Sequence, residues 1–589
     1  MTKIVQRKIK QINTLLSKEQ THILQTAFLL MIPTLLTKVT GQLFNLLAAS
    51  YFGTQDPGWN QFIIANAIPE LITNVFLAGA VGSLVIPILI SAKNEGKETF
   101  YRVYSTIINL SILVFVLISV VLFISAGALI PSIINIFGGE ASQNITSSDY
   151  VRIANMLRAL LVPQMILGIS IFVSNGINVY DRFLIPNFAP LFFNIGRILS
   201  LLIFLPILNN SPWAVIIGTY VGSILHLIIQ LPLYRSLDLK WLPVVDIHSK
   251  YIKELGVLGI PRMFALASEH IVLTFNKFLA YGINQVGPSA LFYANSISLV
   301  IPTLFGFTFS YASYPTLSRL FESQELNKVK DIVQKTLQEI LFLALPFTMI
   351  FTAMRLPVVR LTYGLLPNTN FDLEASSQVA WILMWFSLGW VFLAGKWFMF
   401  RLFYAGKNTL IPFGVALSSL VITIILGLIF SNLMSHNNDY AISQITFTID
   451  NFLTRGSHPA GIGGIALAMS FSYFFEFTML LYFFHKKFIK LDLKDIFIQT
   501  FKKFLSSLIM FLIMYFIYKM WNVLSYSFPD RAGPQYRGST TLNLAILTSI
   551  TVSTGIAVYI LMSALLKVEE LKIFRKFLEP VFKKLKLRI

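Results

Sequence analysis

The sequence predicts an all-α polytopic membrane protein with about fourteen transmembrane helices. Hydrophobic residues make up 55% of the 589 residues, and charged residues only 12%. The apolar residues fall in runs of about 20 or more, the length that an α-helix needs to cross roughly 30 Å of hydrocarbon. These runs lie at about 24–50, 60–92, 103–136, 148–178, 184–207, 212–233, 254–281, 288–318, 336–363, 378–405, 409–431, 461–484, 497–522 and 541–566.

The second run is interrupted in a way that an anchoring helix would not be. Pro69 and Pro87 flank Gly79 and Gly82. Proline removes a backbone donor and small residues let helices approach closely, so we expect a hinge or close packing at these four positions. Broken membrane helices line substrate cavities, because the freed backbone groups need protein or water as partners. The run therefore indicates a transporter.

The charge distribution predicts the orientation of the helices. An even number of helices places both termini on one side. With that side cytoplasmic, the inner loops and tails hold thirty Lys and Arg and the outer loops hold three, Arg455, Arg531 and Arg537. This asymmetry fits the positive-inside rule. It also explains the net charge of +19 through contact with anionic lipid headgroups, so no nucleic-acid partner is expected. Because cysteine is absent, disulfides and thiol chemistry are excluded.

An internal repeat predicts two lobes. Phe44-Asn45, Ala65-Asn66-Ala67-Ile68 and Pro87-Ile88-Leu89 are echoed roughly 230 residues later by Phe275-Asn276, Ala294-Asn295-Ser296-Ile297 and Pro315-Thr316-Leu317. Six helices separate the copies, so two six-helix lobes should be related by a pseudo-two-fold axis along the membrane normal.

The two C-terminal helices belong to neither lobe, and they could form a groove for the tail of a lipid. The expected organisation is a basic cytoplasmic segment at 1–23, lobes at 24–233 and 254–484, the groove helices at 497–566, and a basic cytoplasmic tail at 567–589.

Charged residues within the runs are functional candidates, because a charge in hydrocarbon costs at least a few kcal/mol. Those near helix ends can extend their side chains to the interface: Arg152, Arg355, Arg360, Arg401, Lys502, Lys503 and Lys519. Arg158 is intermediate, and the deeper ones are Lys38, Glu70, Arg197, Arg262, Glu269, His270, Lys277, Lys396 and Glu476.

The seventh run carries the richest set of charges. Arg262, Glu269 and Lys277 are spaced by seven and eight residues and share one helical face. Arg262 and Glu269 fit a cavity lining and an internal ion pair equally well, and a cavity role is favoured for Lys277. His270 alone indicates a packed polar residue rather than a metal ligand.

Several segments resemble the MurJ (MviN) family within the MOP exporter superfamily. Pro69 to Pro87, with Phe76-Leu77-Ala78-Gly79-Ala80, resembles that family's second helix. Further similar segments follow in the family's order: Asn178-Val179-Tyr180-Asp181-Arg182-Phe183-Leu184-Ile185-Pro186, Phe292-Tyr293-Ala294-Asn295 with Tyr314-Pro315-Thr316-Leu317, Phe403-Tyr404-Ala405-Gly406-Lys407-Asn408, and His458-Pro459-Ala460-Gly461-Ile462-Gly463-Gly464.

The resemblance implies a flippase for the peptidoglycan precursor lipid II. Such a protein lies in the bacterial cytoplasmic membrane and works by alternating access in cell wall biogenesis, with consequences for cell shape. The implied partners are a polyprenyl-diphosphate-linked saccharide-peptide, membrane lipids and the cell-wall synthesis machinery. No cofactor or metal is implied, and coupling to the membrane potential or to a monovalent cation stays open.

The chain departs from the family in its cavity charges. Lys38 and Lys396 stand where the family carries basic residues, but neutral residues occupy most other charged positions: Asn45, Thr73, Asn74, Asn295 and Ser296. Two alternatives therefore remain. An exporter of another polyprenyl-linked glycan or amphiphile would use Asn, Thr and Ser for sugar hydroxyls, and a transport-inactive scaffold would need no cavity charge. An enzyme is not expected, because no catalytic arrangement of side chains stands out.

Overall fold

The computed structural model describes residues 23–80, 85–137, 145–366, 369–435, 460–526 and 537–571. These residues form helices and connecting loops and contain no strand, as the apolar runs predict. The chain divides into two compact units, Met1–Ser289 and Ala290–Ile589.

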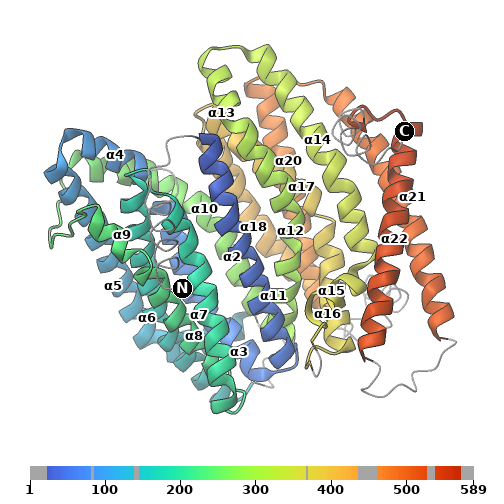
Figure 1. Cartoon of the computed structure of the whole chain (residues 1–589), viewed down its shortest axis with the longest axis horizontal. Coiled ribbons are helices and arrows are strands. Elements are labelled where there is room, and N and C mark those ends of the chain that lie inside the picture. Colours follow the sequence, from blue (N-terminus) through green and yellow to red (C-terminus); the bar gives the residue numbers. More distant parts are fainter. Residues whose placement is uncertain are drawn as a thin grey trace, which may run out of the picture. The chain divides into compact units, whose positions relative to one another are not determined.

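The first unit is a set of helices of very different length (Figure 1). Its elements are α2 (Ile23–Phe52), α3 (Pro57–Ala80), α4 (Val85–Glu95), α5 (Lys97–Phe137), α6 (Ser147–Asn178), α7 (Leu184–Ile207), α8 (Trp213–Ile228), α9 (Leu231–Ser236) and α10 (Lys250–Ile283). The broken second run is thus two helices, α3 and α4. Gly82 lies outside the described residues, and Gly79 is in the last turn of α3.

The second unit begins within α11 (Gly287–Ser298). It continues through α12 (Val300–Pro302), the π-helix η2 (Thr303–Phe307), α13 (Thr308–Glu322), α14 (Leu326–Ala353), α15 (Arg355–Tyr363), α16 (Leu373–Ser387), α17 (Trp390–Ala405), α18 (Leu410–Leu433), α20 (Ala460–Lys487), α21 (Leu493–Tyr526) and α22 (Arg537–Leu565). The run expected at 378–405 is the pair α16 and α17, which is bent by 50°.

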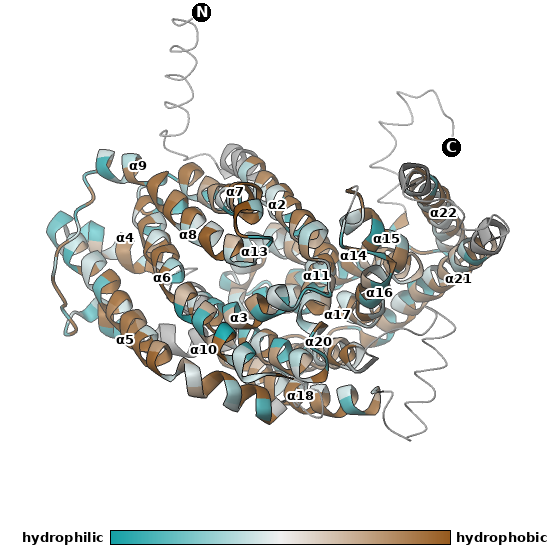
Figure 2. Ribbon diagram, turned by 90° about the horizontal axis from the view of Figure 1, so that it is seen from below, coloured by the Kyte–Doolittle hydropathy of each residue, from teal (hydrophilic) through white to brown (hydrophobic). Residues whose placement is uncertain are grey.

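Ten helices in the described part of the chain are long and apolar enough to span a membrane, or eleven if the bent pair is one span. The expected count of fourteen is not confirmed. Hydrophobic residues cover much of α5 and α18 (Figure 2), and their exposed residues include Leu117, Ile124 and Val421. An apolar exterior of this kind is stable in lipid, so the polytopic membrane class is confirmed.

The unit boundary lies later in the chain than the expected second lobe. That lobe was expected to begin at 254, but α10 packs along α3 and α5 within the first unit. The bounds expected for the two lobes stay a prediction. The relation of the two expected lobes by a pseudo-two-fold axis stays a prediction.

Small residues allow the closest helix contacts in both units. A Cβ added to Gly196 of α7 would lie 2.6 Å from the Cα of Gly222 in α8. In the second unit, a Cβ on Gly464 of α20 would lie 2.4 Å from the backbone of Phe430 in α18. Lipid tails are as apolar as leucine, so membrane helices associate through close packing of this kind.

Candidate functional site

A chain of polar contacts crosses the first unit from α10 through α3 to α6. The Nζ of Lys277 lies 2.8 Å from Oε2 of Glu70, and Asn66 Nδ2 donates to the same oxygen at 3.1 Å. Gln164 Nε2 donates to Asn66 Oδ1 at 3.3 Å, and Thr73 Oγ1 donates to Gln164 Oε1 at 2.9 Å. We call these five residues the Glu70 network.

The Glu70 network links three helices through side chains that the bilayer cannot satisfy. Thr73 Oγ1 also lies 3.0 Å from the carbonyl oxygen of Pro69, one turn earlier in α3, so its single proton is shared between two acceptors. The Thr73 hydroxyl is thus satisfied by protein groups of α3 and α6, as a polar group at membrane depth must be. The Lys277 side chain is 18% exposed and the Glu70 side chain 42% exposed, so the ion pair is only partly shielded from its surroundings.

Arg197 adds a second cation beside the network. Its guanidinium carbon lies 3.6 Å from the centre of the Phe44 ring, so α7 and α2 are joined by a cation–π contact. Among the described residues, its Nε has no hydrogen-bond partner. Glu70 interacts electrostatically with both Arg197 and Lys277. One carboxylate therefore faces two permanent cations, and the excess positive charge suits an anion.

The second unit holds a buried ion pair of its own. Lys396 of α17 lies 2.7 Å from Glu476 of α20, and both side chains are more than nine-tenths buried. The Lys396 ammonium also lies 5.1 Å from the Tyr473 ring centre. A buried pair needs good geometry to offset desolvation, so this contact holds α17 and α20 in one register.

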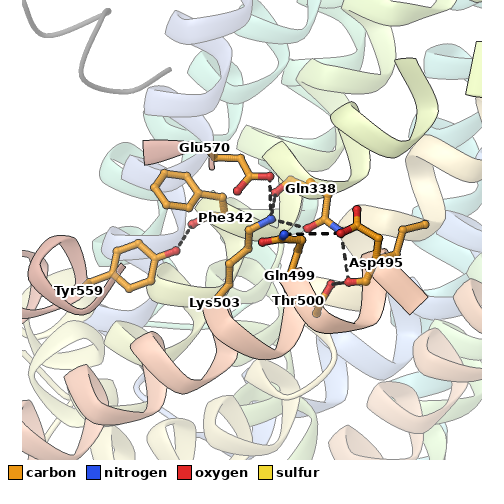
Figure 3. Close-up of polar contacts among 9 residues, drawn as sticks. Gln338, Phe342, Asp495, Gln499, Thr500, Lys503, Tyr559 and Glu570 are labelled. Atoms are coloured by element: carbon orange, nitrogen blue, oxygen red, sulfur yellow. Dashed lines mark hydrogen bonds and ion pairs between the residues drawn. The ribbon is translucent and has the colours of Figure 1, made fainter. Parts of the chain in front are cut away.

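A further buried pair joins the last two helices to α14 (Figure 3). Lys503 of α21 is 0% exposed and lies 2.9 Å from Glu570, which follows α22. Lys503 also donates to the carbonyl oxygen of Gln338 in α14 at 3.2 Å and contacts its side-chain oxygen. The chain turns back after α22 at Lys567, whose φ is +54°, and this brings Glu570 to the lysine.

The interpretation that Lys503 extends to the interface is therefore wrong. A sequence gives the depth of Lys503 along its helix but does not reveal that Glu570 returns to meet it. Arg355 is likewise buried, and its Nη1 donates to the carbonyl of Thr352 at 2.9 Å.

Comparison with known proteins decides the family. The family model described as lipid II flippase MurJ matches residues 48–529, which is most of the chain. The chain belongs to the MurJ family. The lipid II flippase MurJ of Burkholderia cenocepacia is 23% identical over 413 residues, covering 68% of this chain and 77% of that protein. A probable lipid II flippase MurJ from Thermotoga maritima is 24% identical over 546 residues, covering 92% and 96%.

Solved structures agree on the fold. A MurJ structure in an inward closed conformation covers 94% of this chain and 99% of its own, with a TM-score of 0.66 and 19% identity. An inward-facing multidrug transporter of the MATE family, in the MOP superfamily, covers 77% of this chain with a TM-score of 0.54 and 12% identity. The chain therefore shares the fold of these MurJ and MATE structures.

The residues predicted as MurJ-type cavity candidates are placed in several environments. Thr73 and Lys277 join the Glu70 network, whereas Lys396 is buried against Glu476. The rest of those described lie on α2, α3, α10 and α11. Lys38 is exposed. Five of the candidates are half-buried: Asn45, Asn74, Glu269, Asn295 and Ser296.

Arg262 and Pro87 are two further predicted positions. Arg262 lies within α10, but its side chain is outside the described residues. Pro87 is exposed near the start of α4, where its missing N–H costs no helical bond.

The sequence interpretation missed most of the Glu70 network. Glu70 and Arg197 were recognised as deep charges but not as site residues, and Gln164 was not singled out. One signal was present, because Asn66 is the repeat partner of the candidate Asn295. The sequence favoured a cavity role for Lys277 but did not identify Glu70 of α3 as its partner.

Proposed function

We propose that this protein translocates lipid II, or a closely similar polyprenyl-diphosphate-linked precursor, from the inner to the outer leaflet of the bacterial cytoplasmic membrane. Membership of the MurJ family carries the proposal. The excess cationic charge of Lys277 and Arg197 around Glu70 supports it, because a diphosphate head would complete the neutralisation.

The proposed mechanism is alternating access with both termini on the cytoplasmic side. The diphosphate interacts with Lys277 and Arg197, and amides such as Asn66 and Asn74 hydrogen-bond to sugar or phosphate oxygens. The prenyl tail stays in lipid along α21 and α22. Moving one elementary charge across 100 mV is worth about 2.3 kcal/mol, so the membrane potential is a sufficient bias for such a cycle.

Complementation tests this function. The resident lipid II flippase of a bacterium is depleted, this protein is expressed, and growth is followed together with exposure of lipid II at the outer face. Rescue of both supports lipid II as substrate. Failure of both, with the protein present in the membrane, contradicts it and directs the search to another polyprenyl-linked glycan or to a scaffold role.

A further inference from the structure

We propose that Arg401, together with the exposed aromatic residues of η2 and α13, binds the phosphate-bearing head of the lipid-linked substrate when it enters from the cytoplasmic leaflet. This inference rests on the proposed function and names a subsite for it in the second unit, distinct from the Glu70 network.

The guanidinium of Arg401 in α17 lies over two aromatic rings. Its guanidinium carbon lies 3.5 Å from the ring centre of Tyr311 and 4.7 Å from that of Phe307. The two rings are themselves 4.6 Å apart, and Trp397 meets Phe307 edge-on at 6.2 Å. The guanidinium is thus fixed in position before any ligand arrives.

The part of the chain that the structure describes does not neutralise the charge of Arg401. Within the described residues Arg401 makes no ion pair and donates no side-chain hydrogen bond, whereas Lys396, five residues earlier in α17, is fully paired with Glu476. Stacking uses the face of a guanidinium and leaves its in-plane N–H groups free. Those donors match the oxygens of a phosphate, which guanidinium groups bind in bidentate fashion.

A backbone irregularity places the aromatic rings under Arg401. Thr303–Phe307 forms the π-helix η2, and π-helical turns are rare and concentrate at functional sites. A Cβ on Gly306 would lie 2.5 Å from the Cα of Ala394, so only glycine permits this approach of η2 to α17. The widened turn ends at Phe307, directly before the helix that carries Tyr311.

The surface beside Arg401 fits an amphiphile rather than a soluble phosphate. Leu304, Phe307 and Tyr311 follow one another at three and four residues and are 54%, 43% and 58% exposed. Arg401 lies four residues from the end of α17, which is the cytoplasmic end in the proposed orientation. A ligand here would place its phosphate at Arg401 and its hydrocarbon along the apolar face, as a prenyl diphosphate does.

Binding of undecaprenyl diphosphate to the full-length protein in nanodiscs of phosphatidylcholine and phosphatidylglycerol tests the proposal by native mass spectrometry. Arg401→Gln should weaken retention of the probe about tenfold, the effect of losing one charge-assisted hydrogen-bonding group. Tyr311→Leu should weaken retention of the probe less, because the Arg401 guanidinium remains but no longer packs against the tyrosine ring. Arg102→Gln, which removes an exposed arginine from α5, is the matched control and should bind as the wild type does.

Three results would overturn the subsite. They are unchanged binding by Arg401→Gln, an equal loss in the Arg102→Gln control, and a larger effect of Arg401→Gln on retained phosphatidylglycerol than on the prenyl diphosphate. Arg401→Lys keeps the charge without the planar donors and should recover only part of the binding. The assay measures binding and not transport, so a negative result would contradict the subsite at Arg401 without contradicting lipid II flipping. Likewise, a failure of lipid II flipping would not by itself contradict binding at Arg401.

Discussion

The Nζ of Lys277 in α10 lies 2.8 Å from Oε2 of Glu70 in α3. This contact joins α10 to α3 within the first unit, and Arg197 is a second cation near the same carboxylate. A substrate anion at this point would interact with two positive charges and displace little protein structure.

Neutralising the two cations should abolish transport with little loss of folding. We expect Lys277→Gln combined with Arg197→Gln to reduce flipping at least about tenfold, since each cation contributes a charge-assisted contact. The ion pair is partly exposed, so the loss of stability should be only about 1 kcal/mol. Flipping in cells and thermal unfolding in detergent measure the two effects. Normal transport by the double variant would remove these residues from the mechanism.

Glu70→Gln should raise the affinity for the substrate and lower the rate of flipping. Removing the carboxylate leaves two uncompensated cations, which should bind the diphosphate more tightly and release it more slowly. The expected result is increased retention of undecaprenyl diphosphate with reduced flipping. Glu98→Gln, which removes an exposed carboxylate from α5, is the control. A parallel loss of binding and flipping in Glu70→Gln would contradict this role.

Lys396 and Glu476 should behave as a structural pair. Removing one partner leaves a buried charge, so Lys396→Met or Glu476→Gln alone should destabilise the protein by about 3–5 kcal/mol. The double variant Lys396→Met with Glu476→Met should recover most of that loss. If the stable double variant does not flip lipid II, Lys396 has a role in transport beyond packing.

The Lys503–Glu570 pair should control the attachment of α21 and α22 to α14. Lys503→Met should lower the melting temperature markedly, because Glu570 is then buried without its cation. The neighbouring Lys502→Met is the matched control and should be nearly neutral. Equal melting temperatures for both variants would show that the buried pair contributes nothing to stability.

The fold class followed from the sequence because long apolar runs, charge asymmetry and ordered family-like segments are local signals. The helix count and the position of α10 did not, since they depend on bends and on pairing across the chain. The run at 378–405 contains no proline, yet α16 and α17 meet at 50° around Gly389.

The candidate site could be predicted only in part, because its contacts also join helices that are distant in the sequence. Depth along a helix identified Lys277, Lys396, Glu70 and Arg197 as unusual, because any charge in hydrocarbon is costly. Partners come from helices distant in sequence, so neither Glu70 for Lys277 nor Glu570 for Lys503 could be assigned from spacing. The roles of Lys38, Asn45, Asn74, Arg262, Glu269, Asn295 and Ser296 stay predictions.

The most direct measurement is the exposure of lipid II in proteoliposomes that contain the purified protein and lipid II alone. An external enzyme that acts only on outer-leaflet lipid II reports how much of the inner pool becomes accessible. Wild-type protein should expose the inner pool, and the Lys277→Gln/Arg197→Gln variant should leave it protected. An inner pool that stays protected with wild-type protein, or that becomes equally exposed with the double variant, would contradict transport of lipid II through the site beside Glu70.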